Sequence, residues 1–178
     1  GNAVTTSRDV TDRAYACQVL LSLCETVGMR LRRDGQAGSC VTIQLRTSEF
    51  ETWSHQMRLA SATNVTGELY QAASSLLDQA WDRKTPLRQL GVSVTQLADG
   101  TLRQYSLFDA ADYARQEKLD TAVDALREKF GEGALFRAAL LHSDERMAGG
   151  LHKKRRTGIT KPIEDEAARI RKKYGNND

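Results

Sequence analysis

The sequence predicts an α+β fold: a split βαβ-βαβ four-stranded sheet with two helices on one face, followed by a small helical tail. Two observations lead to this prediction. Between residues 1 and 98, hydrophobic patterns of strand period and helix period follow one another in the order strand, helix, strand, strand, helix, strand. After residue 100 the alternation stops, and helical stripes separated by glycines take its place.

The composition fits a globular chain. Its 178 residues are 40% hydrophobic and 28% charged. The absence of an 18-residue apolar run predicts no membrane span, and the first residues do not resemble a signal peptide. Three cysteines (Cys17, Cys24 and Cys40) form no CxxC pair, which disfavours a disulfide framework or a zinc site and favours a cytoplasmic protein.

Residues 2–7, rich in β-branched and small polar side chains, predict the first strand. Asp9 is expected to cap the helix that follows, and Asp12 to add negative charge to its first turn. Gly35 is expected to end this helix. Its apolar stripe recurs at steps of three and four residues: Cys17, Leu20, Cys24, Val27 and Leu31.

Residues 39–46 and 51–59 predict two strands, because hydrophobic and polar residues alternate along them. In the second strand, Met57 and Leu59 are expected to face inward together with His55. We expect His55 to be a partly buried strand residue rather than a metal ligand, since no second histidine lies near it in the sequence.

Thr66 is expected to cap the second helix, which Lys84 and Pro86 interrupt. Its apolar face consists of Leu69, Ala73, Leu76, Leu77 and Ala80. Residues 87–97 then predict the fourth strand, and the Asp99-Gly100 pair predicts a turn.

With both helices on one face of the sheet, the opposite face has no helix to cover it. Hydroxyls, amides and arginines on such a face suit phosphate oxygens, although the pattern by itself favours an ordinary solvated surface. The polar residues expected there are Thr42, Gln44, Arg46, Gln56, Arg58, Gln89 and Ser93.

The segment QYSLF (residues 104–108) has two interpretations. It is either a short strand or a peptide that docks into a hydrophobic pocket of a partner. In the second case Leu107 and Phe108 are the anchors, and Gln104 supplies amide hydrogen bonds.

The tail that follows is predicted to be helical over residues 111–130, 134–141 and 163–174, with one apolar stripe of Leu119, Val123, Leu126 and Phe130. Ten basic and three acidic residues lie between Arg146 and Lys173, so this end is strongly basic. Such a run either contacts phosphate or is a solvated end. We expect a domain at 1–98, a linker at 99–112 and a helical basic tail at 113–178.

Several stretches resemble a known family in their order and spacing: residues 1–6, RDVTD (8–12), RLRR (30–33) with Gly35, TIQLR (42–46) with Phe50, 66–73 and PLRQLGVSV (86–94). Residues 1–98 resemble the little finger domain of Y-family translesion DNA polymerases, the DNA polymerase IV and UmuC/ImpB-MucB-SamB group. The segment Gln104, Tyr105, Ser106, Leu107 and Phe108 is similar to the family's sliding-clamp-binding pentapeptide.

The resemblance implies that the open sheet face grips the backbone of primer–template DNA in DNA repair and damage tolerance, including the SOS response. Arg88 and Gln89 match positions where the family often has basic residues, and Arg58 matches a hydroxyl position. Arg88 has the opposite parity and is expected to reach around the strand edge. His55 and Gln56 replace the family's usual Arg-Ser pair. The DNA-binding residues expected are Thr42, Gln44, Arg46, Gln56, Arg58, Arg88, Gln89 and Ser93.

No catalytic or metal-binding residue is expected in this chain, and no cofactor. The family's palm, whose acidic side chains hold Mg²⁺ in the parent polymerase, lies upstream of the little finger. Residues 140–145 (LLHSDE) mimic a catalytic motif of the palm, but they lack one intervening residue and a partner Asp-x-Asp strand. We therefore expect a non-catalytic fragment, whose partners are primer–template DNA and the sliding clamp and not a membrane.

An alternative from another class is a split βαβ module that binds RNA or a protein. An RNA-binding sheet carries exposed aromatic side chains for base stacking, and the middle strands here offer none on the open face. A stand-alone enzyme is disfavoured because His55, His142 and His152 have no convergent partners in the sequence.

Overall fold

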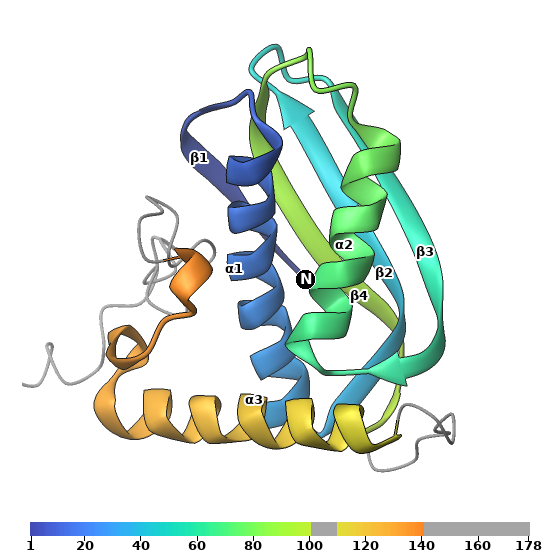
Figure 1. Ribbon diagram of the computed structural model, residues 1–178. Helices are drawn as coiled ribbons and strands as arrows, with labels where there is room; N and C mark the ends of the chain where they lie inside the picture. The colour runs from blue at the N-terminus through green and yellow to red at the C-terminus, as the bar shows by residue number, and fades with distance from the viewer. Residues whose placement is uncertain (101–109, 141–178) are drawn as a thin grey trace, which may run out of the picture.

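The computed structural model describes residues 1–100 and 110–140, and Figure 1 shows the arrangement of their elements. Four strands and three α-helices, followed by two short 3₁₀ turns, make up this part of the chain. In chain order they are β1 (Asn2–Val10), α1 (Arg13–Arg33), β2 (Gln36–Thr47), β3 (Thr52–Thr63), α2 (Thr66–Ala80), β4 (Leu87–Asp99), α3 (Ala110–Phe130), η1 (Glu132–Ala134) and η2 (Ala138–Leu140).

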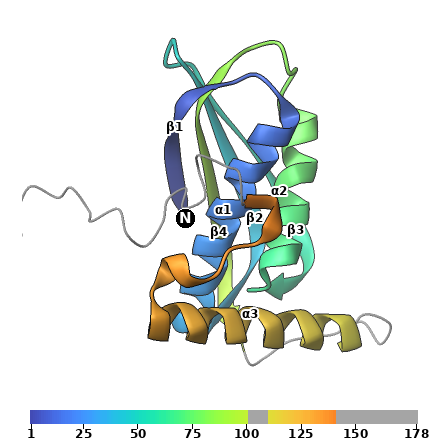
Figure 2. The same ribbon diagram turned by 60° about the vertical axis from the view of Figure 1, so that its left-hand side comes forward.

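The sheet confirms the predicted α+β fold. Its strands lie in the order β1-β4-β2-β3, and every neighbouring pair is antiparallel. Helices α1 and α2 both lie on one side of the sheet, which Figure 2 shows after a turn of the view. The opposite face of the sheet is free of described helices (Figures 1 and 2).

The core lies between the sheet and these two helices, as the hydrophobic patterns predict. Ile43 and Leu45 of β2 are fully buried, and so are Leu20 of α1 and Leu69 of α2. Each such side chain contributes about 1.5–3 kcal/mol through its removal from water. Cys24 is also in this core, where burial raises the pKa of its thiol, so it stays protonated and unreactive.

The beginnings of both helices differ from the sequence-based expectation. Strand β1 continues to Val10, so Asp9 belongs to the strand and does not cap α1. Asp12 is the N-cap, and its Oδ1 accepts the Tyr15 backbone N–H at 2.8 Å. Thr66 is the first residue of α2 rather than its cap, because Val65 occupies the N-cap position with no side-chain hydrogen bond.

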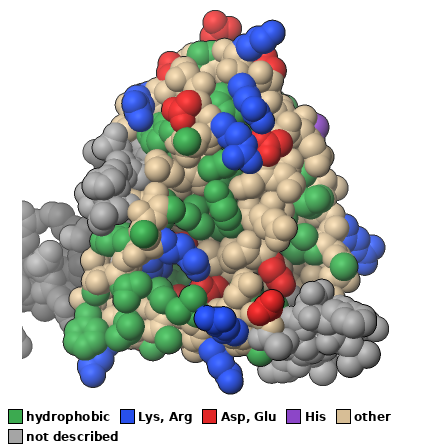
Figure 3. Space-filling view, in the orientation of Figure 1, with side chains coloured by type: hydrophobic (Ala, Val, Ile, Leu, Met, Phe, Trp, Pro, Cys, Tyr) green, Lys and Arg blue, Asp and Glu red, His purple; other side chains and the backbone are tan. Residues whose placement is uncertain are grey.

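Helix α3 confirms the helix predicted after residue 110 and lies across the end of α1 (Figure 1). Its apolar stripe faces solvent: Leu119, Leu126 and Phe130 are 57%, 41% and 64% exposed. In Figure 3, hydrophobic side chains accordingly gather over the C-terminal half of α3. The polar side of α3 packs on the domain, because the groups that meet it there are charged.

Two 3₁₀ turns replace the single helix expected at 134–141. Glycines at 131 and 133 precede the apolar run, which is too short to hold a regular helix without its own core. The QYSLF segment, the LLHSDE motif beyond Leu140 and the 163–174 segment lie outside the described residues. Within the described ranges, no helix is both long and apolar enough to cross a membrane.

Candidate nucleic-acid interface

The register of the three central strands places the predicted polar residues on one face. Thr42 of β2 lies opposite Ser93 of β4 on one side and Gln56 of β3 on the other. Directly opposite residues in antiparallel strands point to the same side of the sheet. Gln44 and Arg46 follow at steps of two, and Arg46 lies opposite Gln89. We call this surface the open face.

From the level of Cys40 to that of Arg46, the paired positions of the open face carry arginines and no acid, whereas Asp99 lies opposite Gln36 beyond this stretch. Arg46 lies near one end of β2, whereas Arg58 of β3 lies opposite Cys40. Six residues of β2 separate these two levels, which corresponds to about 20 Å at 3.3 Å per residue. One phosphate therefore cannot engage both arginines, and a partner that contacts both must extend along the face.

Small residues line the middle of the open face. Gly91 lies opposite Gln44 on one side and Ala3 on the other. A Cβ atom added at Gly91 would lie 3.1 Å from the Ala3 Cβ, tighter than most real contacts. Ser93 follows at a step of two, so no bulky side chain keeps a partner away from the sheet at this level. The sequence pattern placed Gly91 on the outward side of its strand with Gln89 and Ser93, but neither it nor Ala3 was among the predicted interface residues.

His55 is exposed, which corrects the expectation of partial burial. It lies opposite Ile43 and so has the parity of the helix-covered face. However, β3 is the edge strand, and only Trp53, Met57 and Leu59 on its inner side pack against the core. Its neighbour Gln56 is exposed on the open face, where it presents an uncharged amide.

Arg88 does not need to reach around the strand edge. The register shifts between Arg46 and Thr47, which lie opposite Gln89 and Leu87, so β4 has an extra residue there. Because of this bulge, Leu87 and Leu90 are both fully buried, and Arg88 and Gln89 between them are both partly exposed. The Arg88 Nη1 lies 3.5 Å from Asp9 Oδ1, an ion pair with both side chains nearly half exposed.

Arg46 lies against an aromatic ring for which the sequence pattern indicated no function. Its guanidinium carbon is 4.7 Å from the centroid of the Phe50 ring. Its Nη1 donates a long hydrogen bond of 3.4 Å to Gln89 Oε1, whereas its buried Nε has no hydrogen-bond partner. Arg46 is therefore held in place with donors left over.

The predicted clamp-binding segment lies between two anchored flanks. On one side the Gly100 backbone N–H donates to the Gly35 carbonyl oxygen at 3.0 Å. On the other side the buried Tyr113 of α3 donates its hydroxyl to Asn64 Oδ1 at 3.1 Å. Both flanks are thus attached to the same end of the domain.

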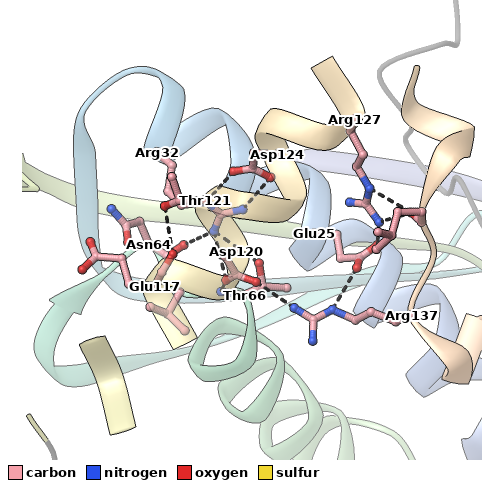
Figure 4. Close-up of polar contacts among 12 residues, drawn as sticks. Glu25, Arg32, Asn64, Thr66, Glu117, Asp120, Thr121, Asp124, Arg127 and Arg137 are labelled. Carbon is pink, nitrogen blue, oxygen red and sulfur yellow. Dashed lines mark hydrogen bonds and ion pairs between the residues drawn. The ribbon is translucent and has the colours of Figure 1, made fainter. Parts of the chain in front are cut away.

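A buried ionic network attaches α3 to that end (Figure 4). Arg32 of α1 pairs with Asp124 at 2.6 Å and with Asp120 at 3.2 Å. Asp120 Oδ2 also accepts the Thr66 backbone N–H at 2.8 Å, so a residue of α3 caps the first turn of α2. The sequence pattern assigned the cap of α2 to Thr66. The group that accepts the Thr66 N–H is instead the side chain of Asp120, which is 54 residues further along the chain.

Glu25 of α1 extends this network. Its carboxylate forms ion pairs with Arg127 at 3.3 Å and with Arg137 at 2.9 Å. Arg137 also reaches Asp120 at 2.8 Å. These acids are all neutralised by arginines, which makes this a structural cluster rather than a metal site. Among residues 1–100 and 110–140, no three His, Cys, Asp or Glu side chains form a group that could hold a metal ion.

Residues 1–107 match the family model described as the impB/mucB/samB family C-terminal domain. The chain is 34% identical over 145 residues to DNA polymerase IV of Clostridium acetobutylicum, covering 82% of this chain and 36% of that protein. It is 37% identical over 126 residues to DNA polymerase IV 2 of Bacillus subtilis, covering 69% of this chain and 30% of that protein. Both alignments are longer than the family match, so the similarity extends beyond residue 107.

The chain thus spans about a third of the length of these curated relatives. Among solved structures, DinB from Sulfolobus solfataricus matches with a TM-score of 0.39 and 15% identity, over 55% of this chain and 27% of that one. The family match covers more than half of the chain and coincides with the sheet and both covering helices. The chain therefore belongs to the impB/mucB/samB family and contains the C-terminal domain of a Y-family DNA polymerase.

Proposed function

We propose that this domain holds primer–template DNA for a Y-family translesion polymerase and that the QYSLF segment tethers the enzyme to the sliding clamp. The stretch of the open face between the levels of Cys40 and Arg46, where arginines about 20 Å apart along the strands have no acid at the paired positions, is the observation that carries the DNA-binding part. The clamp part rests on the sequence of residues 104–108 and on the anchored flanks at Gly100 and Tyr113.

The open face suits the DNA backbone rather than the bases. Arginines, hydroxyls and amides bind phosphate oxygens, and these contacts position a duplex without identifying its sequence. The small side chains of Ala3, Gly91 and Ser93 allow the backbone to approach the sheet. A polymerase that copies any template needs this kind of sequence-independent contact.

The alternative, an RNA-binding module, is less well supported. Single-stranded RNA is bound by aromatic side chains on which its bases stack. The strand pairings in the described residues place no Phe, Tyr or Trp on the open face, and the exposed Phe50 ring lies at its edge, in the turn between β2 and β3, against Arg46. Duplex binding that exceeds single-stranded RNA binding under the same salt would support the DNA assignment.

The DNA-binding part is tested with the double variant Arg58→Ala, Arg88→Ala and a fluorescent primer–template duplex. We expect weaker binding at low salt and a smaller slope of log affinity against log salt, by about 0.9 for each phosphate that is no longer neutralised. Arg33→Ala is the matched control, because its side chain is 65% exposed at the end of α1. Unchanged affinity in the double variant would contradict the proposal.

The clamp part is tested separately with Leu107→Ala, Phe108→Ala. We expect loss of sliding-clamp capture with unchanged duplex affinity, since the hydrophobic anchors and the open face are different surfaces. Leu102→Ala, just before the pentapeptide, is the control. Equal capture by the anchor variant and the control would exclude the motif.

For the whole polymerase, we propose template-directed nucleotidyl transfer with Mg²⁺ held by a catalytic palm, in the cytoplasm. The support is the similarity to proteins named DNA polymerase IV. Assigning the chemistry to a palm leaves this domain the task of positioning the duplex, which contributes to rate through geometry.

A further inference from the structure

The turn between β2 and β3 carries a feature to which no role is assigned. We propose that Phe50 is a positioning residue that holds Arg46 ready for a DNA phosphate, and that its unfavourable backbone conformation is retained for this purpose. This inference rests on the proposed DNA-binding function of the open face.

The backbone of Phe50 is in the left-handed region, with φ of 69°. A bulky residue rarely adopts this conformation, and glycine would adopt it without cost. The turn enforces it: the Thr47 N–H donates to the Glu51 carbonyl oxygen at 3.0 Å, and the Phe50 N–H donates to the Thr47 carbonyl oxygen at 3.3 Å. Strain of this kind persists where another requirement outweighs it.

Core packing is not that requirement. The Phe50 side chain is 73% exposed, the highest value among the large hydrophobic residues that are exposed in the described chain. A phenyl ring so far in water contributes little by burial. The position therefore combines backbone strain with an exposed aromatic ring, and neither stabilises the fold.

The contact that the ring does make is with Arg46. The guanidinium lies over the ring at 4.7 Å from its centroid, a cation–π geometry. No carboxylate of the described residues pairs with Arg46, and its Nε is without a partner. Of the five N–H donors of a guanidinium, the buried Nε is inaccessible and one Nη1 N–H bonds Gln89, so the remaining Nη N–H groups are those left for an anion.

The ring explains how Arg46 stays on the open face without an acidic partner. A carboxylate would hold the side chain but would also neutralise it and repel phosphate. An aromatic face restricts the guanidinium while leaving its charge and its edge donors available. Ordering the side chain before binding reduces the entropy lost when DNA arrives.

The neighbours of Phe50 indicate that the turn itself is not the phosphate site. Glu49 and Glu51 flank it and are both exposed. Their negative charges disfavour phosphate at the tip of the hairpin. The ring is therefore expected to act through Arg46, which lies on the sheet side of these acids.

The test uses the full chain with a blunt-ended DNA duplex, so that no unpaired base is available for stacking. Four single variants are compared by affinity across a salt series and by thermal unfolding: Phe50→Gly, Phe50→Leu, Phe50→Tyr and Arg46→Ala. We expect Phe50→Gly to bind about 2- to 5-fold more weakly, the range of an exposed cation–π contact, yet to unfold at an equal or higher temperature because the strain is relieved.

Phe50→Tyr should bind duplex as tightly as the parent chain. Phe50→Leu should bind as weakly as Phe50→Gly, because only tyrosine retains the aromatic face. In the Arg46→Ala background, Phe50→Gly should have no further effect on affinity. Additive losses would overturn the proposal, since the ring would then contact DNA by itself. Unchanged affinity of Phe50→Gly, or a fall in its unfolding temperature with no change in binding, would also overturn it.

These outcomes separate the inference from the proposed function. If Arg58→Ala weakens binding while the Phe50 and Arg46 variants do not, the roles of Phe50 and Arg46 are wrong and the rest of the open face stands. If none of the arginine variants weakens binding, the open face itself is wrong.

Discussion

At the residue scale, Asp120 shows how much one side chain can organise. It is 4% exposed, and its two carboxylate oxygens accept hydrogen bonds from Arg32, from Arg137 and from the first backbone N–H of α2. A buried carboxylate is tolerated only because each of its oxygens has a charged or backbone donor. Removing it leaves two guanidinium groups with reduced neutralisation and one helix terminus without a cap.

We therefore predict that Asp120→Ala lowers the free energy of unfolding by about 3 kcal/mol, the scale of a broken buried ion pair. Chemical denaturation followed by circular dichroism measures this loss. Asp112→Ala is the control, because Asp112 lies in the exposed first turn of the same helix. A similar loss in both variants would mean that the cost comes from the helix and not from the network.

At the element scale, an ion pair joins the beginning of α1 to the end of α2. Arg13 Nε and Nη2 each lie 2.7 Å from an oxygen of Asp78, in a bidentate arrangement. The hydrogen bond from Arg13 lowers the pKa of Asp78 from 3.8 to about 2. The pair is partly exposed, so its contribution is small and screened by salt.

The sign of the pH dependence follows from the lowered pKa. The stabilisation by Asp78 is fully present above its unfolded-state pKa of 3.8 and disappears as the pH falls through about 2. We predict that Asp78→Asn is slightly less stable than the parent chain from neutral pH to about pH 4, and that the difference vanishes towards pH 2. Thermal unfolding at a series of pH values tests this, and a difference that grows on acidification would contradict it.

At the scale of the whole molecule, charge is distributed unequally over the two sides. Figure 3 shows the helix-bearing side, where acidic and basic side chains are intermixed. The open face has arginines without acids at the paired positions between Cys40 and Arg46. We therefore expect a polyanion to be oriented to the open face, because the opposing charges largely cancel on the other side.

Binding through the open face alone predicts equal affinity for duplexes of unrelated sequence. Contacts to phosphates carry no direct sequence information, and no described helix lies on that side to enter a groove. Competition between duplexes of equal length and different base composition measures this. A strong preference for one sequence at constant salt would show that bases are read by a different surface.

Much of the domain could be predicted from the sequence because its determinants are local. Alternation of period two placed Thr42, Gln44 and Arg46 on one face, and the pairings confirm it. The prediction was wrong where a distant residue intervened. Asp120 caps α2 from another helix, and the bulge in β4 changes the side to which Arg88 points.

Helix α3 shows which features the sequence determines and which depend on the tertiary structure. Its sequence determines that it is a helix and that Leu119, Leu126 and Phe130 share one side. Only the tertiary structure decides which side packs on the domain, because Arg32 and Glu25 require ionic partners that the polar side of α3 supplies. Hydrophobic periodicity identifies faces, whereas the choice between faces depends on the charges that meet them in space.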